Sequence, residues 1–454
     1  TENDMIAALN TTNFMMKRLA VGFSLFHAGA LAESLWFAGG KLDTLKKVLK
    51  PASKEEVKNF FLKPNQYLQK DFPYALRILR EGGFDDVIRF AKGHGLEISI
   101  PEDAGNDIFY YNIKKLDNLW KHQLGIKTSK DIENVFRTFD RITWDQIFTR
   151  SKMFAFLTAL EKDYLYKLGP NGKWGSIKNP NKILPGDDQF TIYRKARGAA
   201  AYVNDAFGGQ NWPNLVSEIT NPFIKKAAQT MLKPGSRGYM QQFLFAPDWT
   251  ISNFRIVAKS MPGFESDPNK RRLYQYYALK AALTFAVAGN LLNYMFAGHS
   301  ILENTDPTRI DLGNGEVLTF SKQLMEPLHW ITDPQSTYIK KIGSLPRTSI
   351  EVLTNKQYLT TKWSPNITKK DDAAIEKALA VGGHVGMRFL PIWLQSATRD
   401  VSEALQNEGL SLDVASDTAV DFVLGQLGHP RYQGPRYTQY KTKGLVRSPY
   451  ETLF

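Results

Sequence analysis

The sequence predicts a mainly α-helical protein: a multi-lobed helical bundle with one small β-hairpin at about 309–320 and an extended C-terminal arm. Two observations carry this prediction. Helix-start signatures precede apolar residues at helical spacing, and a single segment alternates around a Gly-Asn-Gly turn. The 454 residues, 43% of them apolar, suffice for a sizeable core. This length predicts about two to four domains.

The N-terminal helical region is assigned to residues 1–168. Two capping boxes, SKEE at 53–56 and TWDQ at 143–146, each mark a helix start, because the side chains at their ends satisfy free backbone N–H groups. The second box opens a helix that runs through Tyr164 and is apolar on two sides. We expect such a helix to be buried between neighbours.

Residues 169–187 are rich in Gly, Pro, Asn and Lys, which predicts a surface loop or domain junction. A central helical region, 188–300, follows. Its first helix is predicted from Asp188 to Phe207, with small alanines that permit close packing. Gly208-Gly209 is the expected stop signal of this helix.

The string FAPDWT at 245–250 predicts a corner between two helices. Pro247 is disfavoured inside a helix, so one helix should end before it, and Asp248 or Thr250 can cap a second that begins near Trp249. We expect Arg255 to point outward or to be paired. The residues expected to pack inward are Trp249, Phe254 and Ile256.

The C-terminal part of the chain is predicted in three pieces. Residues 301–365 hold loops and the hairpin RIDLGNGEVLTF, which is too short to be stable alone and must lie on the helical body. Residues 366–428 return to helix. Residues 429–454 form an extended tail rich in basic residues and tyrosine.

Three apolar segments, 19–32, 281–297 and 378–394, bear on a membrane role. A membrane-spanning helix needs about 20 apolar residues. All three segments are shorter, and polar residues, glycine or proline interrupt the second and third. None qualifies as a permanent span. We expect all three to be core helices of a bundle, and the alternative is that they unpack and meet a bilayer.

No catalytic motif is found in the sequence. The absence of cysteine excludes disulfides, thiolate catalysis and cysteine metal sites, and no two of the seven histidines have zinc-ligand spacing. Glycine-rich phosphate loops and nucleophile elbows are also absent. Among the acidic pairs Asp85-Asp86, Asp187-Asp188 and Asp371-Asp372, the last two precede predicted helices, where they complement the helix dipole. We expect no cofactor, no metal and no enzyme activity, although an active site built from distant residues stays open.

The charge favours a polyanionic partner. Lys and Arg exceed Asp and Glu by 13, which suits nucleic acid or acidic lipid, or simply makes a basic, soluble surface. The tail from His429 to Tyr450 has five basic residues, no acid and interleaved tyrosines. Its basic side chains can bind the phosphates of a nucleic acid while its tyrosine rings stack on the bases. Alternatively, the tail can dock on a neighbouring subunit. The tail residues assigned to these roles are Arg431, Tyr432, Arg436, Tyr437, Tyr440, Lys441, Lys443 and Arg447.

Two motifs carry a resemblance to a known family. NDAFGGQNW at 204–212 contains the pattern FGG-x-x-W, and FAPDWT follows at 245–250. Together they resemble the phage large polyvalent protein associated domain class, found towards the C-terminal ends of very long bacteriophage proteins. The resemblance covers roughly residues 15–350. Its weaker pieces are Phe26-His27, FDRITWDQIF at 139–148 and Glu326-Pro327-Leu328. The residues of the two main motifs are Phe207, Gly208, Gly209, Trp212, Phe245, Pro247, Asp248, Trp249 and Thr250.

The resemblance implies an internal virion protein that is ejected with the genome and then reaches the host envelope or cytoplasm. For such a protein, with its basic charge, we expect a homo-oligomer that assembles with other virion proteins of the portal, core or ejection apparatus, with contacts to packaged DNA and transient contact with a host membrane. The resemblance supplies no catalytic residue, and the start at Thr1 fits a processed or longer protein. The alternatives are a static portal, tail or core component, and a virion enzyme acting on peptidoglycan or nucleic acid.

Overall fold

The computed structural model is mostly helical, which confirms the predicted fold class. Its described residues are 33–38, 66, 83–98, 148–161, 165–168, 174–177, 179–208, 222, 225, 226, 229, 247–304, 307–313, 316–319, 322–332, 334–342, 344–356, 366–369, 371–387 and 431–433. The apolar segment 19–32 and both capping boxes lie outside them. The domain boundaries drawn from the sequence stay predictions.

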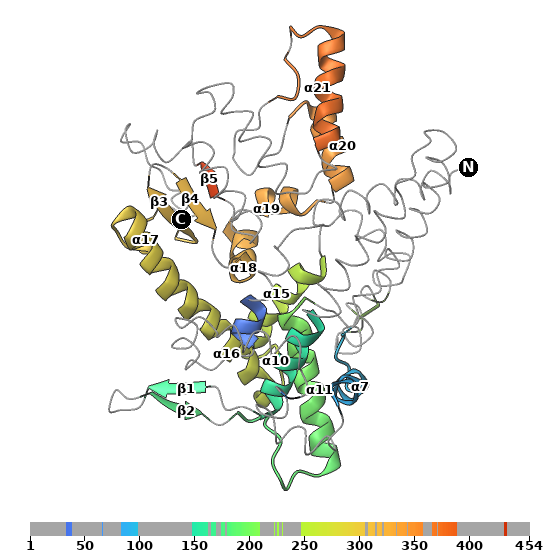
Figure 1. Ribbon diagram of the computed structural model, residues 1–454, viewed down its shortest axis with the longest axis vertical. Coiled ribbons are helices and arrows are strands. Elements are labelled where there is room, and N and C mark those ends of the chain that lie inside the picture. The colour runs from blue at the N-terminus through green and yellow to red at the C-terminus, as the bar shows by residue number, and fades with distance from the viewer. Residues whose placement is uncertain are drawn as a thin grey trace, which may run out of the picture.

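The core is built around four helices: α10 (Thr149–Glu161), α11 (Gln189–Ala206), α15 (Pro247–Ser260) and α16 (Pro268–Thr284). They gather in the lower half of the molecule, with α7 (Phe84–Gly93) next to α11 (Figure 1). Nearly every described side chain of α10 is buried, polar ones included. The prediction of a helix buried between neighbours is therefore confirmed.

Helix α11 begins and ends where the sequence predicts. Asp188 caps it, since its carboxylate accepts a hydrogen bond of 2.7 Å from the backbone N–H of Thr191. Gly208, directly after the C-cap, has a φ of +69°, a conformation that glycine adopts without steric cost. Ala196, Ala199 and Ala200 are fully buried, so small residues line the packed side of the helix.

Helix α15 begins earlier than predicted, at Pro247. Proline is favoured at the first helical position, because the N–H it lacks would have no partner there. Asp248 and Thr250 therefore lie in the first turn, and the expectation that one of them is the cap near Trp249 is wrong. Ile256 is buried as expected. Phe254 is 40% exposed, although its ring contacts the ring of Trp330.

The predicted β-hairpin is present and lies on helix α17 (Asn290–Ala297). Strands β3 (Arg309–Gly313) and β4 (Glu316–Thr319) are antiparallel, and β5 (Arg431–Gln433), from the C-terminal tail, pairs with β4. Ile310 is fully buried and packs with Ile301 and Leu318. A second hairpin, which the sequence did not reveal, joins β1 (Leu165–Leu168), at the end of the predicted N-terminal helical region, to β2 (Trp174–Ile177), within the range assigned to a loop.

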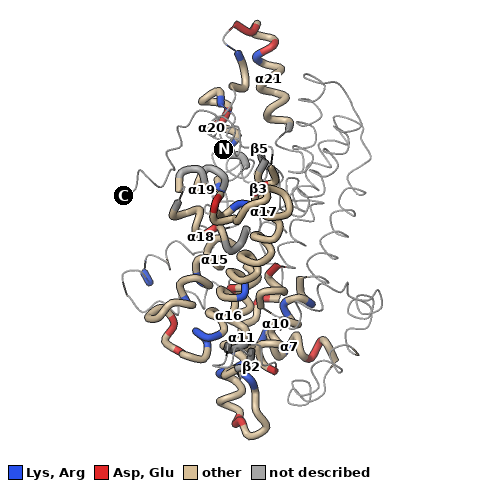
Figure 2. The backbone as a smooth tube through the Cα atoms, turned by 90° about the vertical axis from the view of Figure 1, so that its left-hand side faces the viewer, with Lys and Arg blue, Asp and Glu red and all other residues tan. Residues whose placement is uncertain are grey.

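The remaining described helices are α18 (Lys322–Thr332), α19 (Pro334–Lys341), α20 (Ser344–Thr354) and α21 (Ala374–Met387). Helices α20 and α21 project from one end of the molecule (Figures 1 and 2). The fully buried Glu351 ties them together, since its carboxylate binds Arg347 Nε at 3.1 Å and His384 Nε2 at 2.9 Å.

Candidate functional site

The motif pieces that carry the family resemblance meet in the core. The ring of Phe148, at the end of FDRITWDQIF, contacts Phe207 edge-on, with centroids 6.4 Å apart and planes 82° apart. Gly208 lies against the indole of Trp249, so that a Cβ on the glycine would be 2.6 Å from the ring. FGG and FAPDWT, separate in sequence, therefore form one packing junction.

A buried carboxylate, Asp205, holds the same junction together. It accepts hydrogen bonds from Arg255 Nε at 2.7 Å and from the Tyr274 hydroxyl at 2.7 Å, and it pairs with Lys259 Nζ at 3.1 Å. Burial acts to raise the pKa of Asp205, but the two cations and the hydrogen bonds outweigh it, and the pKa is lowered. The charged side chain thus links α11 to α15 and α16.

A second buried carboxylate, Glu326, links the next layer. Its oxygens accept from Thr250 Oγ1 at 2.6 Å and Asn253 Nδ2 at 2.9 Å, and Lys341 Nζ lies 2.5 Å away. These contacts join α15 to α18 and α19. Both carboxylates are satisfied by donors of this chain, so we assign the motif residues a scaffolding role.

The other predicted motif and tail residues are placed only in part. Pro247 and Asp248 lie in the first turn of α15, while Gly209, Trp212 and Phe245 lie outside the described part of the chain. In the tail, Arg431 and Tyr432 lie in β5, opposite Leu318 and Val317. The tail residues outside the description are Arg436, Tyr437, Tyr440, Lys441, Lys443 and Arg447.

The acidic pairs occupy helix N-termini and not a shared pocket. Asp85 and Asp86 lie in the first turn of α7, Asp187 pairs with Lys195 at 2.6 Å, and Asp372 accepts from the backbone N–H of Lys369 ahead of α21. Among the described residues, no group of three or more His, Asp or Glu side chains is arranged to hold a metal ion. These placements agree with the helix-dipole interpretation.

The structural feature best suited to function is an exposed stripe on one long helix. Helix α16, a π-helical stretch η2 (Phe285–Gly289) and α17 run on without a break. One side of this helix presents large apolar side chains that are 37–67% exposed. We call this stripe the apolar face; its members are Leu279, Leu283, Val287, Leu291, Tyr294 and Met295.

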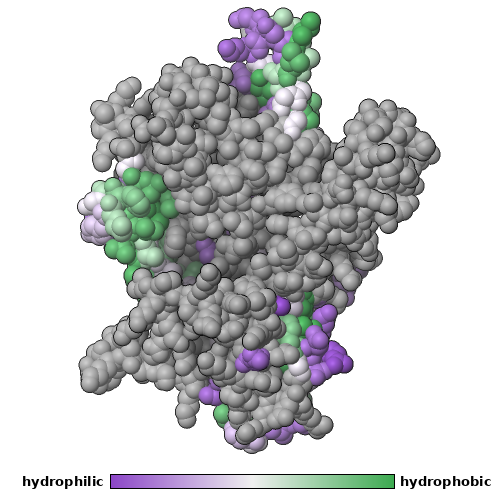
Figure 3. All heavy atoms as spheres, viewed as in Figure 1, coloured by the Kyte–Doolittle hydropathy of each residue, from purple (hydrophilic) through white to green (hydrophobic). Residues whose placement is uncertain are grey.

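The apolar face corrects the expectation of core helices. Segment 281–297 is buried on one side only, and in α21 the side chains of Ile375 and Leu379 are 75% and 70% exposed. Figure 3 shows green, hydrophobic surface over α17 and again over the projecting end. Among the described helices, none is both long and apolar enough to cross a membrane.

The π-helical stretch keeps the apolar face in line. A π-turn holds one residue more than an α-turn, so it rotates the positions after it backward by about 100° relative to an unbroken α-helix. Ala281, Gly289 and Asn293 consequently share the buried side, and Leu283, Val287 and Leu291 share the exposed one.

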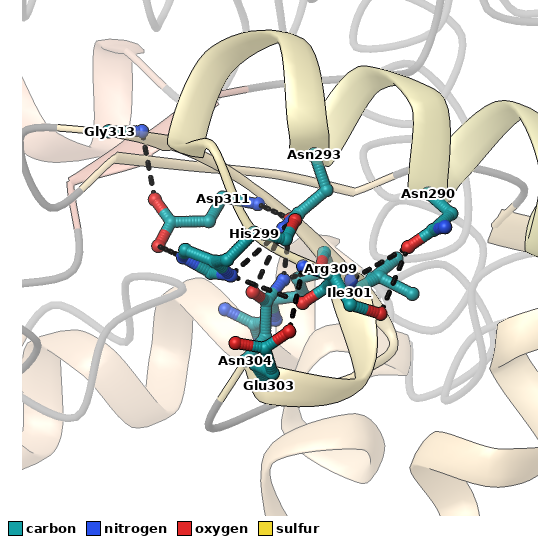
Figure 4. Close-up of polar contacts among 10 residues, drawn as sticks. Asn290, Asn293, His299, Ile301, Glu303, Asn304, Arg309, Asp311 and Gly313 are labelled. Carbon is teal, nitrogen blue, oxygen red and sulfur yellow. Dashed lines mark hydrogen bonds and ion pairs between the residues drawn. The ribbon is translucent and has the colours of Figure 1, made fainter.

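Two asparagines that interrupt the apolar segment anchor its inner side (Figure 4). Asn293 is fully buried; its Nδ2 donates to the His299 carbonyl at 2.8 Å, and its Oδ1 accepts from Asn304 Nδ2 and from the Asp311 backbone N–H, both at 2.7 Å. Asn290 Oδ1 accepts from the Ile301 backbone N–H at 2.9 Å. We call this arrangement the asparagine clamp; it holds α17 to β3 and leaves the opposite side apolar.

Lys280 anchors the other end of the helix on its buried side. Its Nζ donates to the carbonyl of Trp36 and lies 4.5 Å from the centroid of that residue's ring. Trp36 Nε1 in turn donates to Thr284 Oγ1 at 3.1 Å. Burial lowers the pKa of Lys280 to about 7. The lysine directly before segment 281–297 thus points into the protein.

Sequence reasoning found the apolar segment but not its exposed side. The signal was the asymmetry of the segment: its two polar residues, Asn290 and Asn293, are three positions apart and so lie on the same side of a helix. No model of a known protein family matches the chain, and no curated protein or solved structure does either. The family resemblance therefore stays a prediction.

Proposed function

We propose that this protein is a non-catalytic assembly protein of a bacteriophage virion interior, which is ejected with the genome and acts in the host envelope or cytoplasm. The observation that carries the assembly role is the apolar face, a row of exposed large apolar side chains on a firmly anchored helix. A patch of this kind typically marks an interaction site. The virion setting rests on FGG-x-x-W and FAPDWT.

Two further features support the proposal. The buried carboxylates of the junction, Asp205 and Glu326, are committed to bonds between helices, which favours a scaffolding role for them. The net charge of +13 suits contact with packaged DNA. Other virion proteins of the portal, core or ejection apparatus are the partners that such a protein would meet.

The deciding experiment compares the protein composition of full virions with that of particles emptied of DNA, by quantitative mass spectrometry for this chain. Loss of the chain in step with the DNA is the expected result. Retention at full stoichiometry would contradict ejection and identify a static portal, tail or core component. Absence from both particles would contradict a virion role and direct attention to enzymatic activity on peptidoglycan or nucleic acid in the infected cell.

A further inference from the structure

We infer that the apolar face pairs with the same face of a second copy of this chain. The two helices would run antiparallel about a two-fold axis close to Ala286 and Val287, which lie midway along the face. This inference rests on the proposed assembly role and names the partner of the surface. It makes the paired helices the contact that nucleates a larger assembly.

The size of the apolar face fits such a pairing. Six side chains that average just over half exposed present roughly 650 Å² of surface, at about 200 Å² for each side chain when fully exposed. The largest apolar patch on a typical monomer is about 300–600 Å². One side of a standard protein interface is about 800 Å². The face is therefore at the upper limit for a free surface and approaches the area that one partner of a stable dimer buries.

The chemistry of the face suits its own copy. Residues 281–302 contain no Asp, Glu, Lys or Arg, so antiparallel pairing brings no like charges together. Leucine, methionine and aromatic side chains make up most of the face, and interface cores are enriched in methionine and aromatics and depleted of charge. A two-fold contact requires such a self-complementary patch.

Small residues at the centre allow the two helices to approach. Ala282 and Ala286 are exposed between the larger side chains, on the same side as Leu283 and Val287. Packed helices lie about 8–10 Å apart, and the shorter distances need small residues at the contact. The face therefore has projecting large side chains toward its ends and a shallow depression at its centre, so that the same face of a second copy can fit against it.

A bilayer fits the face less well than a second copy does. Helices that lie in a membrane surface carry lysine or arginine beside their apolar side, to meet anionic headgroups. Here the helix has no basic residue from Ala281 to its end at Ala297, and Lys280 is 3% exposed and directed at Trp36. The surface thus lacks the cationic rim that lipid binding would use.

The test measures the mass of the full chain in solution by light scattering at about 10 µM, above the micromolar dissociation constants of weak interfaces of this size. We expect twice the 51.5 kDa of one chain. The double variant Val287→Lys/Leu291→Lys should shift the mass to that of one chain. Both positions are about 60% exposed, so the fold is retained, which circular dichroism verifies. The matched control is Leu353→Lys, an 86% exposed leucine on α20, which should leave the mass unchanged.

A cross-link tests whether the two copies meet at the centre of the face. Because the chain has no cysteine, Ala286→Cys introduces a single thiol, and antiparallel pairing predicts a disulfide-linked dimer on mild oxidation. Leu353→Cys should give little disulfide-linked dimer under the same oxidation.

Three results would overturn the inference. The unaltered chain could be monomeric at this concentration. It could be oligomeric with a mass that the double lysine variant does not change, which would place self-association on another surface and leave the proposed assembly function standing. It could bind vesicles of phosphatidylcholine and phosphatidylglycerol through the face, with binding lost in the double variant, which would make the occupant a bilayer. The virion-composition experiment tests ejection independently of all three.

Discussion

Gly208 lies under the indole ring of Trp249, at a distance that leaves no room for a side chain. A Cβ placed on this glycine would come within 2.6–2.9 Å of three ring atoms. Gly208 also has a φ of +69°, in the region that residues with a side chain adopt at a cost. The glycine that ends α11 is thus also the surface on which the first turn of α15 rests.

The first prediction is that Gly208→Ala destabilises the protein by about 2–4 kcal/mol, because strain at positive φ adds to overpacking against Trp249. Urea denaturation measures this loss in the free energy of unfolding. Gly298→Ala is the control, since Gly298 has a similar φ of +76° but nothing within 4 Å of its Cβ position. The free energy of unfolding of Gly298→Ala should fall only by the cost of strain at positive φ, about 1–2 kcal/mol. Equal losses in both variants would show that the contact with Trp249 is not tight.

The second prediction concerns Asp205→Asn, which leaves Arg255 and Lys259 without their buried counter-charge. Breaking a buried pair on one side costs about 3–5 kcal/mol, so we expect a loss of that order. The control is Asp267→Asn, because Asp267 caps α16 by accepting from the Asn269 N–H, and asparagine caps equally well. A loss no larger than in the control would contradict the assigned role of Asp205.

The stability of the unaltered protein also depends on pH through Asp205. The folded pKa of this group is lowered, so the unfolded state binds its proton first as the pH falls. Its contribution is therefore complete above the usual aspartate pKa of about 3.9 and declines below it. Acid titration of stability should show this decline in the unaltered protein and a smaller one in Asp205→Asn.

The third prediction is that Asn293→Ala loosens the hairpin from α17. The substitution leaves Asn304 Nδ2 and the Asp311 N–H without the carbonyl oxygen that they share, and each buried group left unpaired costs about 1–3 kcal/mol. Hydrogen exchange measured by mass spectrometry should rise in β3 and β4 and stay unchanged in α10. Asn290→Ala, which affects the more exposed part of the clamp, should have a smaller effect. Unchanged exchange in β3 would contradict the clamp.

The fourth prediction is that Lys280 makes the protein more stable as the pH rises from about 7 to about 10. The folded state releases the proton near pH 7, whereas the unfolded chain holds it to about pH 10.4, so the unfolded state binds more protons between these values. The slope attributable to this group is at most about 1.4 kcal/mol per pH unit. Denaturation of Lys280→Met across this range should lack that slope, and Lys270→Met on the same helix should keep it. A slope that survives in Lys280→Met would assign it to other groups.

Several elements could be predicted because their signals are local. Asp188 and Gly208 mark the two ends of α11 through capping and backbone conformation, which neighbouring residues determine. The β3–β4 hairpin follows from its glycine turn. The second hairpin, β1–β2, was missed because its strands are four residues each and its loop composition dominates the segment. Phe254 was assigned inward because helix periodicity does not tell which side a neighbouring helix will cover.

The sequence by itself determined the helical class, the lack of cysteine chemistry, the basic charge and the ends of the best-marked helices, because these depend on composition and on contacts within a few residues. Only the tertiary structure decided that Phe207, Gly208 and Trp249 form one junction, that Asp205 and Glu326 are committed to bonds between helices, and that one side of 281–297 is exposed. Burial depends on which distant segments cover a surface, and a π-turn in the middle of a helix sets which residues face them. Local sequence carries neither piece of information.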